Sequence, residues 1–206
     1  MNLNILYHDA AVIVLNKPAG LLSVPGRGED KLDSLAWRAQ QMFTDAKVVH
    51  RLDCHTSGVM LMARGLDAQR ELSRQFHDRE TEKHYIAVVH GCVEQDEGVI
   101  ELAMRCDPDN RPVQILDEVH GKPSITRWAV IERNTDTTRL KLMPVTGRSH
   151  QLRVHCRAQG HAIVGDRLYG NEADLHESRM LLHAERLVFR HPETGQRMAM
   201  TAECEF

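Results

Sequence analysis

The feature that most constrains the fold is a polar segment enclosed by two apolar ones, at residues 48–63. Two valines lead into it, and the alternating apolar run 59–63 follows it. Both flanks predict short strands, because apolar and β-branched runs of this kind are typical of strands. The polar residues between them, 50–58, end in a Thr-Ser-Gly triplet that favours a tight connection. Binding and catalytic groups commonly lie on loops that two rigid elements hold in this way.

Asp53 and Arg51 place a carboxylate and a guanidinium on this loop. The residues alone leave two interpretations open. Asp53 either accepts hydrogen bonds from nearby backbone N–H groups, which is the common role of an aspartate in a turn, or it acts as a nucleophile or base that an arginine orients. The choice between them depends on the rest of the chain.

The composition is typical of a protein from a reducing compartment. Of the 206 residues, 42% are hydrophobic, which is enough to bury a core without disulfides. The five cysteines are scattered and form no C-x-x-C pair, which argues against a disulfide framework or a zinc ribbon. No apolar run reaches membrane-spanning length, and the N-terminus lacks the layout of a signal peptide. A net charge of −3 weakens the case for a nucleic-acid partner, although local clusters of basic residues matter more than the sum.

Apolar periodicity predicts more strands than helices, without a regular alternation of the two. The predicted strands cover residues 5–7, 12–15, 83–91, 98–102, 124–131, 138–143, 180–189 and 198–203. This pattern favours an α+β fold with a mixed, mainly antiparallel β-sheet core and flanking helices over a doubly wound sheet. The sequence contains no repeat, low-complexity tract or linker, so we expect a single domain over residues 1–206.

Capping residues predict three helices. Asp33 and Asp67 are expected to be the N-caps of the first two, and Ser149 of a third helix that stops at Gly160. Arg148 stands at the start of the third helix, where a helix N-terminus and a guanidinium together suit an anion. That anion is either a substrate phosphate or a protein carboxylate such as the aspartate of the central loop.

Thirteen histidines invite a search for a metal site. The sequence contains no H-E-x-x-H and no set of Cys and His with zinc-binding spacing. His50, Asp53 and Ser57 are the residue types of a hydrolytic triad, but all three fall in one short loop and no G-x-S-x-G elbow is present. Glycine motifs for phosphate or dinucleotide binding do not occur either. The sequence therefore predicts neither a metal nor a cofactor.

Residues 50–58 closely resemble the central motif, H-R-L-D-x-x-T-S-G, of the RluA-type pseudouridine synthases. The resemblance continues in four other blocks, which come in the order that the family has them. These blocks are residues 16–21, 83–87, 146–155 and 181–184. Five ordered blocks over most of the chain are a far more specific signal than the central match alone.

The resemblance implies an enzyme that isomerises uridine in RNA to pseudouridine without a cofactor. By position in the motifs, Asp53 would be the catalytic aspartate, and Arg51 would enter the space left by the flipped base. Tyr85 would stack on the uracil, and Arg148 would pair with Asp53. Substrate-binding residues are expected in the same blocks, at His50, Thr56, His150, Arg153 and Leu182.

The short chain most resembles the dual-specificity RluA branch of the family, and we expect no N-terminal S4-like RNA-binding module. That branch modifies an anticodon-loop uridine of tRNA and a hairpin uridine of 23S rRNA. These RNAs are therefore the expected partners of a monomeric, cytoplasmic enzyme that does not associate with membranes. Three alternatives stay open: a synthase with a single tRNA or rRNA substrate, a non-catalytic RNA-binding or RNA-folding protein on the same scaffold, and a glycosidase-like hydrolase that releases free uracil.

Overall fold

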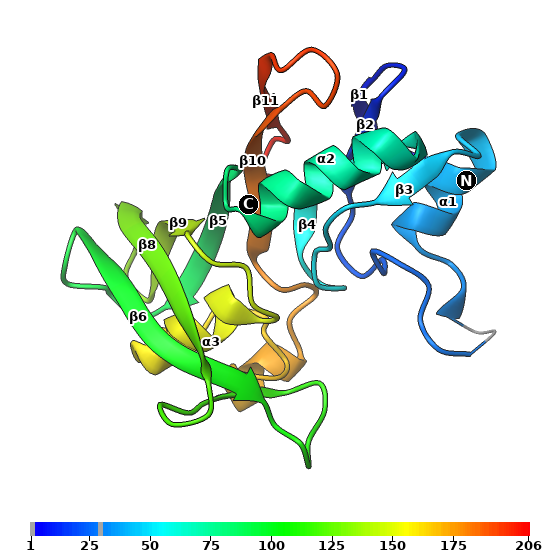
Figure 1. Cartoon of the computed structure of the whole chain (residues 1–206). Coiled ribbons are helices and arrows are strands. Elements are labelled where there is room, and N and C mark those ends of the chain that lie inside the picture. The colour runs from blue at the N-terminus through cyan, green and yellow to red at the C-terminus, as the bar shows by residue number, and fades with distance from the viewer. Residues whose placement is uncertain (1–2, 29–30) are drawn as a thin grey trace. The chain divides into compact units, whose positions relative to one another are not determined.

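The computed structural model describes residues 3–28 and 31–206, and the chain divides into two compact units (Figure 1). The terminal unit comprises Met1–Lys83 and His183–Glu205, and the central unit comprises His84–Leu182 with Phe206. Each unit has its own strands, helices and apolar core. The expectation of one catalytic domain stays a prediction.

The terminal unit contains strands from both ends of the chain. These are β1 (Ile5–His8), β2 (Val12–Lys17), β3 (Ala46–Val48), β4 (Ser57–Arg64), β10 (Leu182–Arg190) and β11 (Arg197–Thr201). Their order is β1-β2-β4-β10, with β3 paired to β4 and β11 paired to β10. The pairs are antiparallel except β4 with β10, which run parallel with Ser57 opposite His183 and Gly58 opposite Ala184.

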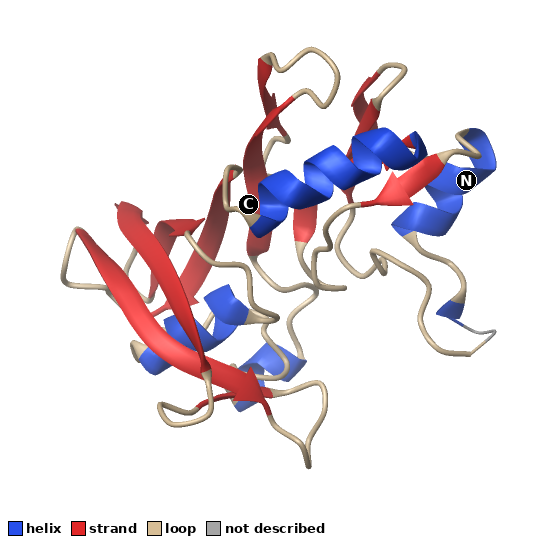
Figure 2. Ribbon diagram, viewed as in Figure 1, coloured by secondary structure: helices blue, strands red, loops and turns tan. Residues whose placement is uncertain are grey.

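Strand β4 is the apolar centre of the terminal unit. Its successive residues Val59 and Met60 point to opposite faces, and both are at most 2% exposed. Helix α2 (Gly65–His77) lies across β3 and β4 and covers one of these faces (Figure 2). The helix buries one apolar stripe, because Ala68, Leu72 and Phe76 pack with β4 side chains in one cluster. Helix α1 (Leu35–Met42) precedes β3.

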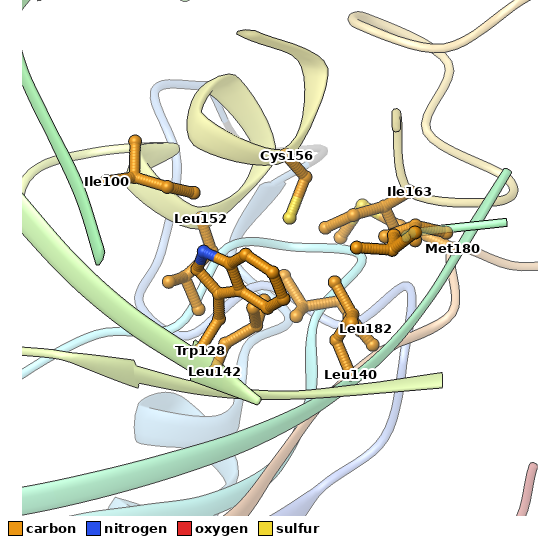
Figure 3. Close-up of a cluster of buried hydrophobic side chains, with 12 residues drawn as sticks. Ile100, Trp128, Leu140, Leu142, Leu152, Cys156, Ile163, Met180 and Leu182 are labelled. Atoms are coloured by element: carbon orange, nitrogen blue, oxygen red, sulfur yellow. The ribbon is translucent and has the colours of Figure 1, made fainter. Parts of the chain in front are cut away.

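The central unit is an antiparallel sheet with one helix packed against it. Its strands are β5 (Glu82–His90), β6 (Glu97–Cys106), β7 (Gln114–Leu116), β8 (Lys122–Arg133) and β9 (Thr137–Pro144), in the order β5-β9-β8-β6-β7. Helix α3 (Gln151–Ala158) and the short 3-10 helix η2 (Glu172–Leu175) follow. Trp128 and Leu142 of the sheet pack with Leu152 and Cys156 of α3 in a buried cluster (Figure 3). The predicted α+β fold with mainly antiparallel strands is confirmed.

The predicted N-caps of the first two helices are wrong by one to three positions. Ser34, not Asp33, caps α1, because its hydroxyl accepts a hydrogen bond from the Trp37 N–H at 3.2 Å. The Asp33 carboxylate instead makes two hydrogen bonds of 2.7 Å with the guanidinium of Arg38. Asp67 lies inside the first turn of α2, where its negative charge interacts favourably with the helix N-terminus.

The N-terminus of α3 also differs from its prediction, whereas its C-terminus does not. The N-cap is His150, in a left-handed conformation with φ 55°, and not Ser149. Gly160, with φ 82°, lies just after the C-cap residue Gln159, so the predicted stop is confirmed. Among the described residues, none of the helices has the length and apolar character needed to cross a bilayer.

Candidate active site

Asp53 lies in the loop between β3 and β4 of the terminal unit. Its side chain is half-buried, and its carbonyl accepts a hydrogen bond from the backbone N–H of Thr56 at 3.1 Å. Arg51, two residues earlier, is exposed, whereas Leu52 between them is buried. The buried side chain of Leu52 therefore anchors the backbone between Arg51 and Asp53, the two residues expected to be catalytic.

A fully buried lysine fixes the chain immediately after Asp53. The ammonium of Lys17, which is 0% exposed, donates to the carbonyl oxygens of Cys54 (2.9 Å), Pro18 (2.9 Å) and Leu21 (2.7 Å). The Gly20 N–H also donates to the Cys54 carbonyl, at 2.9 Å. Hydrogen bonds from a charged donor are stronger than neutral ones, so this cluster holds the block 16–21 firmly against the Asp53 loop.

A buried serine fixes the chain immediately before Asp53. The Ser23 hydroxyl donates to the Leu52 carbonyl at 2.6 Å and accepts from the Leu52 N–H at 3.0 Å. Because Ser23 and Lys17 hold the residues on the two sides of Asp53, the backbone of the aspartate has little freedom to move.

The Thr-Ser-Gly triplet ends the loop against strand β10. The Ser57 hydroxyl lies 2.8 Å from Nδ1 of His183, and Nε2 of His183 lies 3.1 Å from the Ala202 carbonyl. A carbonyl only accepts, so Nε2 of His183 carries a hydrogen and donates to Ala202. Gly58 has φ 111°, and a Cβ at this position would lie 2.2 Å from the Ala184 carbonyl. The close parallel pairing with β10 therefore requires glycine here.

His50 is held inside the terminal unit. Its ring stacks on Phe76 with centroids 4.4 Å apart, and its Nε2 accepts a hydrogen bond from the Leu61 N–H at 2.9 Å. Burial of the ring, with a smaller contribution from the positive charge of Lys83, lowers the pKa of His50 to about 3. The imidazole is therefore neutral near pH 7, and its expected contact with substrate stays a prediction. Thr56, the other expected binding residue of the loop, is 3% exposed.

Acidification is expected to destabilise the terminal unit through His50. An unfolded histidine has a pKa of about 6.5, so below that pH the unfolded chain binds a proton that the folded chain excludes. The contribution of His50 is complete above about pH 6.5 and is lost as the pH falls towards 3, by about 1 kcal/mol per pH unit. Urea unfolding at pH 7, 6, 5 and 4 measures this slope. His50→Gln should flatten the slope by that amount, and an unchanged slope would show that another group causes the loss.

The other expected site residues belong to the central unit. Tyr85 lies on β5 and packs, partly buried, against the apolar cluster that contains Trp128. Leu182 lies in the same cluster and is 3% exposed. Arg148 is exposed in the turn between β9 and α3. The pairing of Arg148 with Asp53 stays a prediction, because the two residues belong to different units.

The side chain of Gln151 fixes the turn that carries Arg148. Its Oε1 accepts from the Arg148 backbone N–H at 3.0 Å and from the Thr146 hydroxyl at 2.7 Å. Its Nε2 donates to the Ile125 carbonyl and to the Thr126 hydroxyl, both at 3.0 Å. Gln151 is 3% exposed, so these four bonds are made in a buried setting where an unpaired amide would be costly.

Arg153 has an internal partner. Its guanidinium makes two hydrogen bonds with the Asp166 carboxylate, of 2.7 and 2.6 Å, and the two side chains are 5% and 0% exposed. Its expected contact with RNA stays a prediction.

Several residues that position the site were not predicted from the sequence. These are Lys17, Ser23, Gln151 and His183. Their roles depend on contacts between distant segments, and the one available signal was that Lys17, Gln151 and His183 fall within the recognised blocks.

The charged side chains of the Asp53 loop suit a nucleophilic or electrostatic reaction. Within the described residues, no group of three or more His, Cys, Asp or Glu side chains is arranged to hold a metal ion. The loop presents a carboxylate, which can act as a nucleophile or stabilise positive charge, and a guanidinium, which can bind an anion.

Comparison with known proteins identifies the family. The sequence profile described as RNA pseudouridylate synthase matches residues 11–158. The dual-specificity RNA pseudouridine synthase RluA of Yersinia pestis is 50% identical over 204 residues, which cover 98% of this chain and 99% of that protein. The protein of the same name from Escherichia coli (strain K12) is 48% identical over 204 residues, which cover 98% of this chain and 93% of that protein.

A solved structure agrees with the sequence comparisons. Human RNA pseudouridylate synthase domain containing 1 matches with a TM-score of 0.83 and 29% identity, over 98% of this chain and 83% of that chain. The family profile covers more than half of the chain, and the relatives cover nearly all of it. The chain belongs to the RNA pseudouridylate synthase family and is of the RluA type, whose members are RNA-modifying isomerases.

Proposed function

We propose that the protein converts uridine to pseudouridine in two RNAs, at an anticodon-loop position of tRNA and at a hairpin position of 23S rRNA. The observation that carries this proposal is the 45% to 50% identity, over at least 98% of the chain, to proteins named dual-specificity RNA pseudouridine synthases. Because the match covers nearly the whole chain, all five sequence blocks lie within it, and the same blocks can contact both RNAs. We expect a monomeric enzyme in the cytoplasm.

The reaction balances without a redox partner. The N1–C1′ bond of uridine breaks, the uracil turns, and a bond forms between C5 and C1′. C5 then loses its hydrogen as a proton, and N1 gains a proton. Neither electrons nor a group is exchanged with another molecule, so carboxylate and guanidinium side chains are sufficient for the chemistry.

Asp53 is the group that we propose to act on the nucleoside. Its carboxylate attacks the sugar or the base, or stabilises the electron-poor C1′, as the carboxylates of glycosidases do. The hydrogen bonds to Leu52 and Cys54 support this role, because a carboxylate on a fixed backbone is already oriented before RNA arrives.

The remaining residues are proposed to hold the target nucleotide. A base in folded RNA must leave its stack before its glycosidic bond can be reached, and the exposed Arg51 is suited to take the vacated space. An aromatic face such as that of Tyr85 offers about 1–3 kcal/mol of stacking to the flipped uracil. Arg148 orients Asp53, and exposed arginines contribute phosphate contacts.

Tritium release tests the proposal. The purified protein is mixed with an anticodon stem–loop or with the 23S rRNA hairpin, each carrying uridine labelled with tritium at C5. Because C5 loses its hydrogen, we expect catalytic release of tritium from both RNAs. Matched RNAs with cytidine at the target position should release none.

The other outcomes would each contradict part of the proposal. Release from one RNA alone would make the protein a single-substrate synthase. Binding of both RNAs without release would indicate a non-catalytic RNA-binding protein. Free uracil, detected by chromatography of the reaction mixture, would indicate a hydrolase.

A further inference from the structure

A ring of contacts in the central unit joins the start of α3 to the turn that follows the helix. It begins at the buried pair of Arg153 and Asp166. Oδ1 of Asp166, besides accepting from the guanidinium, accepts from the backbone N–H groups of Leu168 (3.0 Å) and Tyr169 (3.2 Å). The backbone of Tyr169 is therefore fixed relative to α3 by one carboxylate.

The side chain of Tyr169 closes the ring. It is 4% exposed and packs with Met104 and Val154, and the Arg153 guanidinium lies 4.9 Å from its ring centroid. Its hydroxyl lies 2.7 Å from the backbone nitrogen of Gln114 on β7 and 2.7 Å from Nδ1 of His150. A buried tyrosine with both ends engaged is rigid, so it is suited to hold other groups in place.

The chemistry of the hydroxyl sets the direction of these bonds. The Gln114 N–H donates to the hydroxyl oxygen, so of the two neighbours His150 alone can accept the hydroxyl hydrogen. Nδ1 of a neutral His150 is then the acceptor, and its ring hydrogen is on Nε2.

His150 occupies a backbone conformation that needs support. Its φ of 55° lies in the left-handed region, which non-glycine residues adopt at some cost and often at functional sites. It is the N-cap of α3 and lies two residues after Arg148, in the turn that leads into the helix. A contact that holds the His150 ring therefore also holds the left-handed backbone of this turn.

We propose that Tyr169 is a positioning residue for the reaction. Its hydroxyl holds His150 in its left-handed backbone conformation, and this contact fixes the turn that presents Arg148. The effect on activity rests on the proposed function, because Arg148 is expected to orient Asp53. The contact itself does not rest on it. The Arg153–Asp166 pair supplies the fixed support from which Tyr169 acts.

A double-mutant cycle tests the proposal with the tritium assay. Tyr169→Phe should lower kcat about tenfold through loss of the buried hydroxyl, while KM changes less than about twofold. His150→Gly, which accepts the left-handed backbone but lacks the ring, should cause a similar loss. In the His150→Gly background, Tyr169→Phe should cause a further loss of less than about twofold.

The cycle separates the two neighbours of the hydroxyl. A full tenfold loss in the His150→Gly background would show that Tyr169 acts through Gln114, and would overturn the proposal. Tyr7→Phe is the matched control, because it removes a hydroxyl whose hydrogen bond to Asp9 is exposed, and it should keep the wild-type kcat. Wild-type kcat in Tyr169→Phe would also overturn the proposal.

A second measurement tests the contact between Tyr169 and His150 without using enzyme activity. Nitrogen chemical shifts of His150 in the RNA-free protein at neutral pH should show the Nε2–H tautomer, and Tyr169→Phe should shift them towards a mixture of the two tautomers. Unchanged shifts would overturn the proposal even if kcat fell. If the wild-type protein released no tritium, the proposed function would fail, and these shifts would still decide whether Tyr169 positions His150.

Discussion

Asparagine in place of Asp53 is expected to lower the rate of pseudouridine formation about 10⁴-fold or more, while affinity for RNA changes less than about threefold. The substitution keeps the shape of the side chain and removes its negative charge, and with it the group that acts on the sugar or base. The neighbouring backbone is held by Ser23 and Lys17, so the loop should keep its conformation. The rate loss would then report chemistry and not unfolding.

Two measurements check this expectation. Single-turnover tritium release gives the rate, and equilibrium binding to the anticodon stem–loop gives the affinity. Asp67→Asn is the matched control, because this carboxylate is 97% exposed on α2, and it should behave as wild type. Full activity of Asp53→Asn would refute the assigned role, and an equal loss of rate and affinity would make Asp53 a binding residue instead.

Methionine in place of Lys17 is expected to lower the free energy of unfolding by about 2–6 kcal/mol. Methionine matches the aliphatic stem of the lysine but donates nothing, so the carbonyls of Pro18, Leu21 and Cys54 would lose their shared donor. The Cys54 carbonyl keeps its bond from the Gly20 N–H, and each of the other two acceptors left without a partner costs about 1–3 kcal/mol. The cost should fall on the segments that flank Asp53, because those are the segments that the ammonium joins.

Urea unfolding and hydrogen exchange measure this effect. The midpoint of unfolding should fall, and backbone amides of residues 17–21 and 50–56 should exchange faster than in the wild type. Lys47→Met, on the neighbouring strand β3 and partly exposed, is the matched control and should change stability by less than about 0.5 kcal/mol. An unchanged midpoint for Lys17→Met would show that the ammonium is dispensable for the loop.

Local patterns were sufficient to predict most strands and the stop of α3. Strand β5 is an example, because a strand was predicted over residues 83–91, and Ala87 and Val89 are both 0% exposed in one cluster with Tyr85. Apolar periodicity carries this information because it reports which face each element buries.

The N-terminal boundaries of the helices were less predictable. At Asp33 the sequence offered two adjacent capping side chains, and the arginine four residues after Ser34 engaged the aspartate and left the serine as the cap. At His150 a tertiary contact from Tyr169 accompanies a left-handed conformation that capping rules do not anticipate. Capping preferences rank the candidate residues, and the side-chain partners available to each candidate select among them.

The buried polar contacts of the candidate site were not predictable from local sequence. Lys17 bonds to Cys54 across 37 positions, and Gln151 reaches Ile125 across 26. Arg153 was assigned a role in substrate binding from its charge and its block, while its observed partner, Asp166, lies 13 positions away. A charged residue near a motif has the same appearance in a sequence whether it faces solvent or an internal carboxylate.

The pairing of Ser57 and Gly58 with His183 and Ala184 has a consequence for biosynthesis. Ser57 and His183 are separated by 126 positions, so a ribosome that has finished the central motif has not yet made the strand that supports it. At about 5–20 residues per second, synthesis of the intervening segment takes about 6–25 seconds, and the growing polypeptide lacks the supporting strand during that time. Premature termination after Gly58 but before β10 would therefore release a product that contains the whole central motif and lacks the strand that holds it in shape.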